Sequence, residues 1–259
     1  MTGQAVETAK DPDLTSDDFL GGRLSVLQPR KGHRSGIEAV LISAAAPLAR
    51  GETVVDIGSG VGVAGLCALA RVPDTRAILV EADPDMAALA RQNAARNGLA
   101  DRIDVHAIDI AARGAIASSG LSDAADHALA NPPFYDPAAS RTSPAKAMAH
   151  AAPVDALDAW LRFAAAVVRP GGSLTLVHRA EALGRVLEAF GRRFGGAAVL
   201  PVHSRPGQPA SRVIVQGRKG SRAPLSILPG LVLHGPDGHA FRADVERILR
   251  GGAKLELIR

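Results

Sequence analysis

The sequence is poor in cysteine, since Cys67 is the only one among 259 residues. One thiol cannot form an internal disulfide, and it cannot supply a zinc site built on paired cysteines. A chain of this length can bury a full hydrophobic core without such cross-links. Histidine does not replace the missing ligands, because His33, His150, His203 and His234 are too scattered to indicate a metal site. We therefore expect no bound metal.

Aromatic residues and long hydrophobic runs are also scarce. Six Phe, one Tyr and one Trp cannot form the stacking platform that proteins use for single-stranded nucleic acid. The apolar stretches are interrupted by Gly, Arg or Pro well before about 18 residues, so no membrane span is expected. The N-terminal residues 1–10 lack a basic region followed by an apolar run, which is the pattern of a secretory signal. These absences favour a cytoplasmic location.

Positive charge is in small excess overall, with 30 Lys and Arg against 26 Asp and Glu. The excess is uneven along the chain. Residues 179–259 contain fourteen basic and six acidic side chains, whereas residues 1–18 lean acidic. This distribution is compatible with a surface facing a polyanion such as RNA, although an ordinary solvated exterior is the favoured interpretation.

The order of apolar segments predicts the fold class. Residues 1–18 are polar and read as a mobile leader, and residues 19–50 as an N-terminal extension. From residue 51 to 259, short apolar runs alternate with longer helical ones, which is typical of an α/β domain with a mainly parallel sheet and helices on both faces. We expect strands at 24–27, 53–57, 77–80, 103–107, 127–130, 173–177, 197–203 and 212–216, and helices at 37–48, 63–71, 85–97, 155–168, 182–190 and 241–249. A hairpin or strand is expected around 231–234.

A glycine-rich turn follows the strand expected at 53–57. Its last part, Gly60 to Gly65, matches the dinucleotide-binding pattern G-x-G-x-x-G, so a dehydrogenase is one interpretation. However, Asp56 lies at the mouth of the strand, where a carboxylate would repel a pyrophosphate. S-adenosylmethionine has an ammonium group and no phosphate, and we expect Asp56, Gly58 and Gly60 to contact it. In the alternative interpretation, Asp56 only hydrogen-bonds the glycine loop.

Two further acids follow the next strands. Glu81 ends the second strand of the alternating region, 25 positions after Asp56, where a carboxylate can accept both ribose hydroxyls. Asp109 follows the third strand and could accept from an adenine amino group. Because the carboxyl ends of parallel strands share one edge of the sheet, these acids support the same cofactor site.

The sequence Asn131-Pro132-Pro133-Phe134 follows the strand at 127–130 and indicates the chemistry. The two prolines fix the backbone, so the Asn131 amide and the carbonyl of Pro132 form a preset pair of acceptors. Such a pair suits a planar NH2 group, and Phe134 offers a ring on which the base can stack. A rigid turn without function is the alternative interpretation of the two prolines.

This arrangement permits methyl transfer to nitrogen. A conjugated amine is a poor nucleophile, but accepting hydrogen bonds from both of its N–H groups raises the electron density on nitrogen. The nitrogen can then attack a sulfonium methyl group without a metal or a strong general base, because positioning and electrostatics supply the catalysis. Asn131, Pro132 and Phe134 are therefore the expected catalytic residues.

From about residue 19 onward the chain resembles the bacterial family of adenine-N6 methyltransferases that modify adenine 37 of a valine tRNA, within the class I S-adenosylmethionine-dependent amino-group methyltransferases. The resemblance lies in residues 32–41, in the Asp56 glycine loop, in residues 131–135 and in residues 233–238. It implies a Rossmann-like seven-stranded sheet, an N-terminal extension beside the cofactor with Arg34 helping to close the site, and tRNA as partner. Phe134 stands where the family usually has Tyr, and residues 136–153 form the expected substrate loop.

Three other functions remain open on sequence grounds. A protein glutamine methyltransferase uses similar motifs but usually has a helical substrate domain before the first strand, where this chain has only about 50 loop-like residues. An rRNA guanine-N2 methyltransferase is compatible with the same motif, although those enzymes often carry a duplicated domain. A cofactor-binding scaffold without turnover is disfavoured by the intact Asn131 and Phe134.

Overall fold

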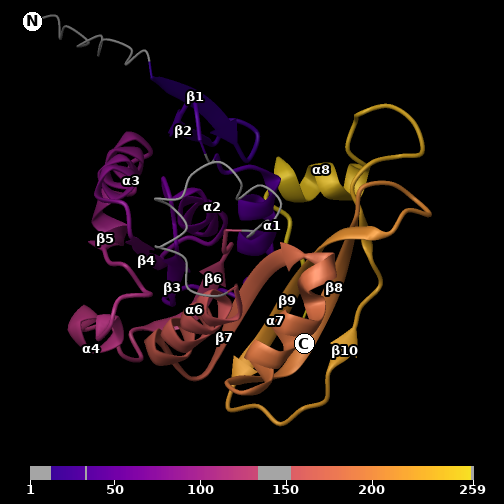
Figure 1. Ribbon diagram of the computed structural model, residues 1–259. Coiled ribbons are helices and arrows are strands. Elements are labelled where there is room, and N and C mark those ends of the chain that lie inside the picture. Colours follow the sequence, from indigo (N-terminus) through magenta and orange to yellow (C-terminus); the bar gives the residue numbers. More distant parts are fainter. Residues whose placement is uncertain (1–12, 33, 134–152, 258–259) are drawn as a thin grey trace, which may run out of the picture.

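The computed structural model describes residues 13–32, 34–133 and 153–257. Within these residues one sheet contains nine strands in the order β10-β8-β9-β7-β6-β3-β4-β5, with β11 pairing with β8 (Figure 1). Its strands are β3 (Thr53–Ile57), β4 (Arg76–Glu81), β5 (Ile103–Ala107), β6 (Ala125–Ala130), β7 (Val168–Arg179), β8 (Phe194–His203), β9 (Ala210–Lys219), β10 (Ser226–Ile227) and β11 (Leu231–Val232). Strands β5, β4, β3, β6 and β7 are parallel, and β9 runs antiparallel to β7 and β8. The expected mainly parallel, Rossmann-like sheet is confirmed, with two short strands added to its seven.

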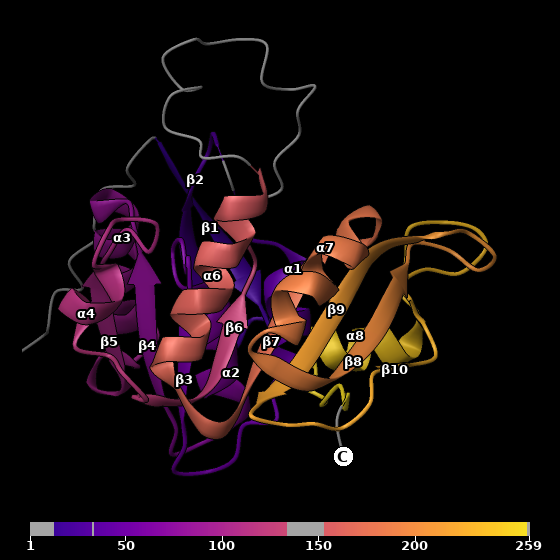
Figure 2. The same ribbon diagram turned by 60° about the horizontal axis from the view of Figure 1, so that its bottom comes forward.

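Helices cover both faces of the sheet, as predicted from the alternation. They are α1 (Ile37–Ala45), α2 (Val63–Arg71), α3 (Pro84–Arg96), α4 (Ala115–Ser119), α6 (Pro153–Val167), α7 (Leu183–Gly191) and α8 (Ala243–Leu249). One buried apolar cluster contains residues of α1, α2, α3 and α8, and the other contains residues of α6 and α7. Figure 2 shows α6 and α7 in front of the sheet, with α1, α2 and α8 behind it. The two clusters explain why the central strands are apolar on both faces.

The N-terminal region differs from the predicted leader. Strand β1 (Leu14–Phe19) pairs antiparallel with β2 (Leu24–Pro29), so the prediction that residues 1–18 are a leader is wrong for residues 14–18. The sequence of β1, LTSDDF, shows no apolar alternation, and the strand is held instead by cross-strand pairing and by polar contacts. Residues 1–12 lie outside the described part.

Two asparagines, one in α3 and one capping its C-terminal end, attach this hairpin to the rest of the protein. The fully buried Asn93 accepts the backbone N–H of Leu27 and donates to the carbonyls of Leu27 and Val61. One helical turn later, Asn97 makes the corresponding pair of bonds with the backbone of Ser25. Because Val61 belongs to the glycine-rich turn, Asn93 fixes the hairpin beside that turn.

The C-terminal region extends the sheet beyond its antiparallel strand. The segment after β11 is closed by an isolated antiparallel bridge between His234 and Phe241, whose rings stack with centroids 4.7 Å apart. No sequence pattern indicated α4, a five-residue helix, or the two-residue strand β10.

The thiol of Cys67 is fully buried in α2, and burial raises its pKa to about 12. In the part of the chain that the structure describes, no helix is both long and apolar enough to cross a membrane.

Candidate active site

A cavity of about 380 Å³ lies at the carboxyl ends of the central parallel strands. Its volume is within the range of small-molecule and cofactor sites. The cavity brings together four residues that the sequence singles out, Gly58, Gly60, Glu81 and Asn131. The other lining residues are Gln28, Ser35, Val61, Val80, Ala82, Asp83, Met86, Ile108, Ile110, Pro133 and Trp160. One edge of the sheet therefore gathers three of the six predicted cofactor residues, Gly58, Gly60 and Glu81, and the predicted catalytic asparagine.

The glycine turn between β3 and α2 forms the floor of this cavity. Gly58 and Gly60 have φ angles of +64° and +54°, in the left-handed region that side chains rarely adopt. A Cβ atom on Gly58 would lie 2.1 Å from the Trp160 ring, so the indole packs directly against this glycine. A Cβ atom on Gly60 would meet no protein atom within 4 Å. Gly58 thus accommodates Trp160, and Gly60 leaves space free for a ligand.

Asp56 lies beneath the turn and is only 3% exposed. Its Oδ2 accepts the backbone N–H of Gly65 at 2.9 Å, and it is not among the residues that line the cavity. Burial raises the pKa of this carboxyl to about 7, although the bond from Gly65 opposes the shift. The expected contact of Asp56 with the ligand stays a prediction. The alternative interpretation, in which Asp56 supports the glycine loop, fits this position.

Glu81, at the end of β4, lines the cavity as predicted. Its Oε2 accepts the N–H of Gly60 at 2.7 Å and its Oε1 accepts the N–H of Asp83 at 3.0 Å. Each carboxylate oxygen can accept a further bond, so two hydroxyl groups of a ligand could still bind. The two backbone donors hold the carboxylate facing the cavity.

Asp109 is not among the residues that line the cavity, and its expected contact with the ligand stays a prediction. Its exposed carboxylate accepts the N–H of Ala111 at 2.9 Å. The neighbours Ile108 and Ile110 line the cavity instead, together with Met86 of α3. These three side chains form an apolar wall that suits the face of a ring.

The predicted catalytic loop begins where β6 ends. Asn131 and Pro133 line the cavity, and the intervening Pro132 is buried. The amide nitrogen of Asn131 lies 3.5 Å from Oε2 of Glu38, which is in the first turn of α1. Phe134 and the expected substrate loop 136–153 lie outside the described residues, apart from the loop's last residue. The position of Asn131 agrees with its predicted role, while the stacking role of Phe134 stays a prediction.

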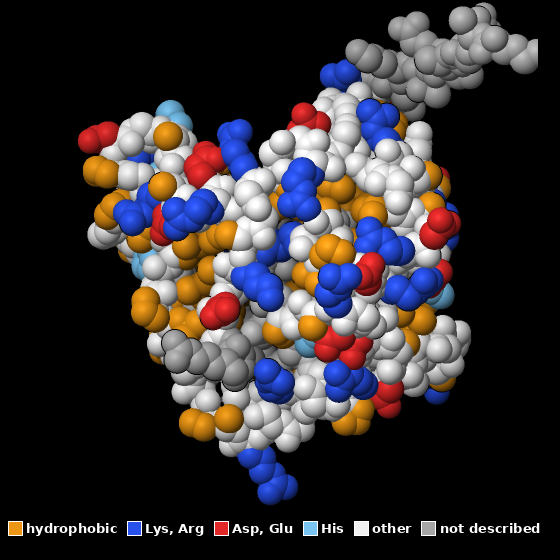
Figure 3. All heavy atoms as spheres, turned by 180° about the vertical axis from the view of Figure 1, so that it is seen from behind, with side chains coloured by type: hydrophobic (Ala, Val, Ile, Leu, Met, Phe, Trp, Pro, Cys, Tyr) orange, Lys and Arg blue, Asp and Glu red, His pale blue; other side chains and the backbone are white. Residues whose placement is uncertain are grey.

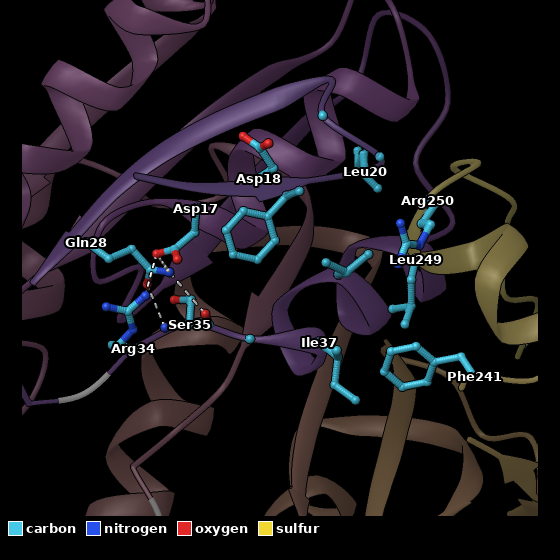
Figure 4. A pocket seen from close by; sticks show the side chains of 15 residues that line it. Asp17, Asp18, Leu20, Gln28, Arg34, Ser35, Ile37, Phe241, Leu249 and Arg250 are labelled. Atoms are coloured by element: carbon cyan, nitrogen blue, oxygen red, sulfur yellow. Dashed lines mark hydrogen bonds and ion pairs between the residues drawn. The ribbon is translucent and has the colours of Figure 1, made fainter. Parts of the chain in front are cut away.

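Arg34 belongs to a neighbouring cavity of about 590 Å³ between the N-terminal hairpin, α1 and the C-terminal region (Figure 4). Its guanidinium forms an ion pair with Asp17 at 2.5 Å and donates to Thr15 Oγ1 at 2.7 Å. Arg34 therefore ties the loop before α1 to the hairpin and does not line the candidate active site.

Gln28 and Ser35 line both cavities and form the wall between them. The buried Gln28 accepts the N–H of Ser35 at 2.8 Å and donates to its carbonyl at 3.2 Å. Sequence reasoning missed these residues and Trp160. The rarity of tryptophan was the one available signal, because a lone Trp soon after a substrate loop is a candidate for ligand contact.

Several basic side chains of the C-terminal third pair with acids from earlier in the chain. Arg193, Arg212 and Lys219 form ion pairs with Asp158, Glu38 and Asp123 respectively. Figure 3 shows Lys and Arg spread over one face, with Asp and Glu beside several of them. The charge excess in the sequence is thus partly neutralised by folding. Among the described residues, no three His, Cys, Asp or Glu side chains come together as a metal-binding group.

Comparison with known proteins gives three consistent matches. The family model described as "Methyltransferase small domain" matches residues 38–200, more than half of the chain. The tRNA1(Val) (adenine(37)-N6)-methyltransferase of Serratia proteamaculans is 32% identical over 200 residues, covering 76% of this chain and 75% of that relative. The protein of the same name from Yersinia enterocolitica is 26% identical over 219 residues, covering 83% and 85%.

Among solved structures, a predicted O-methyltransferase from Agrobacterium tumefaciens aligns with a TM-score of 0.72 and 30% identity, over 84% of this chain and 98% of that one. TrmN from Thermus thermophilus aligns with a TM-score of 0.52 and 22% identity, over 73% and 50%. The matched segment 38–200 includes the glycine turn, Glu81, Asn131 and Trp160, so the family match covers most of the cavity.

Proposed function

Since the chain belongs to the methyltransferase small domain family, we propose that it methylates the N6 amine of an adenine in tRNA. It is an S-adenosylmethionine-dependent N-methyltransferase, and the proposal concerns its substrate. The observation that carries the proposal is that Asn131 lines the same cavity as Gly58, Gly60 and Glu81. This shared lining supports a role for Asn131 as an acceptor for the target amine beside the residues proposed to hold the cofactor.

The residues of the cavity fit the cofactor. Gly60 leaves free the space that a side chain would fill, and Glu81 faces the cavity with acceptors for ribose hydroxyls. Met86, Ile108 and Ile110 give an apolar wall for an adenine ring. When bound, S-adenosylmethionine supplies a methyl group on a positively charged sulfur, which is a good leaving group once neutral.

The work of the protein is to orient the amine. Oδ1 of Asn131 and the carbonyl of Pro132 would each accept one hydrogen of the NH2 group, which directs the nitrogen lone pair toward the cofactor. Two acceptors match the two hydrogens of an amine, whereas a hydroxyl group has one. This difference supports nitrogen as the acceptor, although the similar Agrobacterium structure is described as an O-methyltransferase.

The choice of adenine in tRNA is supported by the names of the two curated relatives. The aromatic residue after the two prolines, Phe134, would stack on the base that carries the amine. A tRNA substrate would also agree with the cytoplasmic location expected from the sequence.

The test is incubation of the purified protein with labelled S-adenosylmethionine and unmodified total tRNA, rRNA or release factors. We expect label on tRNA, recovered as N6-methyladenosine after nuclease digestion. Asn131→Ala should abolish the label while cofactor binding, measured separately, persists. Label on a release-factor glutamine or on rRNA guanine would replace this proposal with one of the two alternatives.

A further inference from the structure

The orientation of the Asn131 amide decides whether the proposed reaction can occur. An asparagine amide is nearly symmetric in shape, so packing alone does not determine which of Oδ1 and Nδ2 faces a ligand. If Nδ2 faced the target amine, donor would meet donor and neither hydrogen would find an acceptor. A hydrogen bond from outside the cavity must therefore set the orientation.

Glu38 is placed to do this. Its Oε2 lies 3.5 Å from Nδ2 of Asn131, and an ionised carboxylate can only accept. The amide nitrogen therefore faces Glu38, which leaves Oδ1 for the cavity. The bond is long, and contacts of this kind often shorten when substrate binds. Glu38 lies in the first turn of α1, where the helix dipole favours a negative charge.

Arg212 holds the carboxylate of Glu38 from the other side. Its Nε donates to Oε1 at 2.6 Å, so one oxygen is engaged by the guanidinium and the other is left for Asn131. Arg212 is near the start of β9, the strand that runs antiparallel to β7. This reversed direction brings the beginning of β9 to the edge of the sheet where the parallel strands end.

We propose that Glu38, held by Arg212, is a positioning residue that fixes the Asn131 amide with its carbonyl oxygen toward the target amine. The inference rests on the proposed function, because it concerns the same asparagine and the same amine. It adds residues of α1 and β9 to the residues that line the candidate active site.

The test reverses the polarity of the pair. Asn131→Asp removes the donor and sets two carboxylates against each other, so we expect kcat to fall roughly 100-fold. Glu38→Gln alone lets the Asn131 amide adopt either orientation, and we expect kcat to fall about tenfold with the Kd for S-adenosylmethionine unchanged. In the double variant, the new amide at position 38 can donate to the new carboxylate at position 131, whose other oxygen still accepts from the substrate. The double variant should therefore recover about tenfold in kcat over Asn131→Asp. Additive losses would overturn the proposal.

Two measurements separate this inference from the proposed function. Urea unfolding of the same four proteins without substrate should show a favourable coupling between positions 38 and 131, whatever the substrate is. Glu188→Gln, which alters the exposed pair with Arg192 on α7, is the matched control and should leave kcat unchanged. If the wild-type protein methylates tRNA and neither kcat nor stability shows coupling, the inference fails while the function stands. If the coupling is present but tRNA gains no methyl group, the proposed substrate fails instead.

Discussion

Replacing Gly58 with alanine should destabilise the protein more than the same change at Gly60. Both glycines have positive φ, so each alanine incurs about 1–2 kcal/mol of left-handed backbone strain. Only Gly58→Ala also places a methyl group 2.1 Å from the Trp160 ring, and such overpacking typically costs about 1–3 kcal/mol more. For a protein of this size each kcal/mol lowers Tm by about 2–4 °C, so the two variants should differ by about 2–12 °C.

Differential scanning fluorimetry of the two variants, without cofactor, measures this difference. A Trp160→Leu background provides the control, because the shorter side chain removes the collision and the two alanines should then cost the same. Gly60→Ala should instead weaken cofactor binding, since its methyl group occupies free space in the cavity. Equal Tm losses in the wild-type background, or a difference that survives Trp160→Leu, would refute the packing argument.

Three further predictions concern charge. Because the pKa of Asp56 is raised to about 7, the folded state keeps a proton that the unfolded state releases near pH 4. The stability gained by Asp56→Asn should therefore grow between about pH 4 and pH 7 and then level off. A gain that does not depend on pH in urea titrations would contradict the buried carboxyl. Glu81→Ala should raise the Kd for S-adenosylmethionine, measured by calorimetry, about 10- to 100-fold. The control Asp104→Asn changes an exposed ion pair on β5 and should leave this Kd unchanged. Equal effects of the two variants would show that Glu81 does not bind the cofactor. If the basic surface faces RNA, the logarithm of the tRNA binding constant should fall linearly with the logarithm of salt concentration, and a slope near zero in filter binding would exclude that surface.

The central strands were predictable because burial on both faces leaves short, continuous apolar runs. Strands β3 and β5 and helix α2 have the bounds expected from the sequence. Strand β1 could not be predicted, since its stability comes from pairing with β2 and from the Arg34–Asp17 ion pair. Long-range pairing of this kind leaves no periodic pattern in a short polar segment.

The candidate site was predictable where backbone chemistry dictates the residue. Glycine is favoured at positive φ, and proline fixes the loop after Asn131, so the glycine turn and the Asn-Pro-Pro loop can both be recognised as motifs in the sequence. The direction of Asp56 was not predictable, because one position along a strand exchanges the face on which a side chain lies. Asp109 lies two residues beyond β5, where this alternation gives no guide. Glu38 and Arg212, 174 positions apart, meet only because β9 reverses direction.

The burial of Cys67 makes the protein convenient for site-specific labelling. Its fully enclosed thiol, with a pKa near 12, holds almost no thiolate at neutral pH and should resist maleimide reagents while the protein is folded. One cysteine introduced on the surface, for example in the β1–β2 hairpin, would then be the reactive one in the part of the chain described. A fluorophore at that position could report how close bound RNA comes to the N-terminal hairpin, with the native thiol left in place.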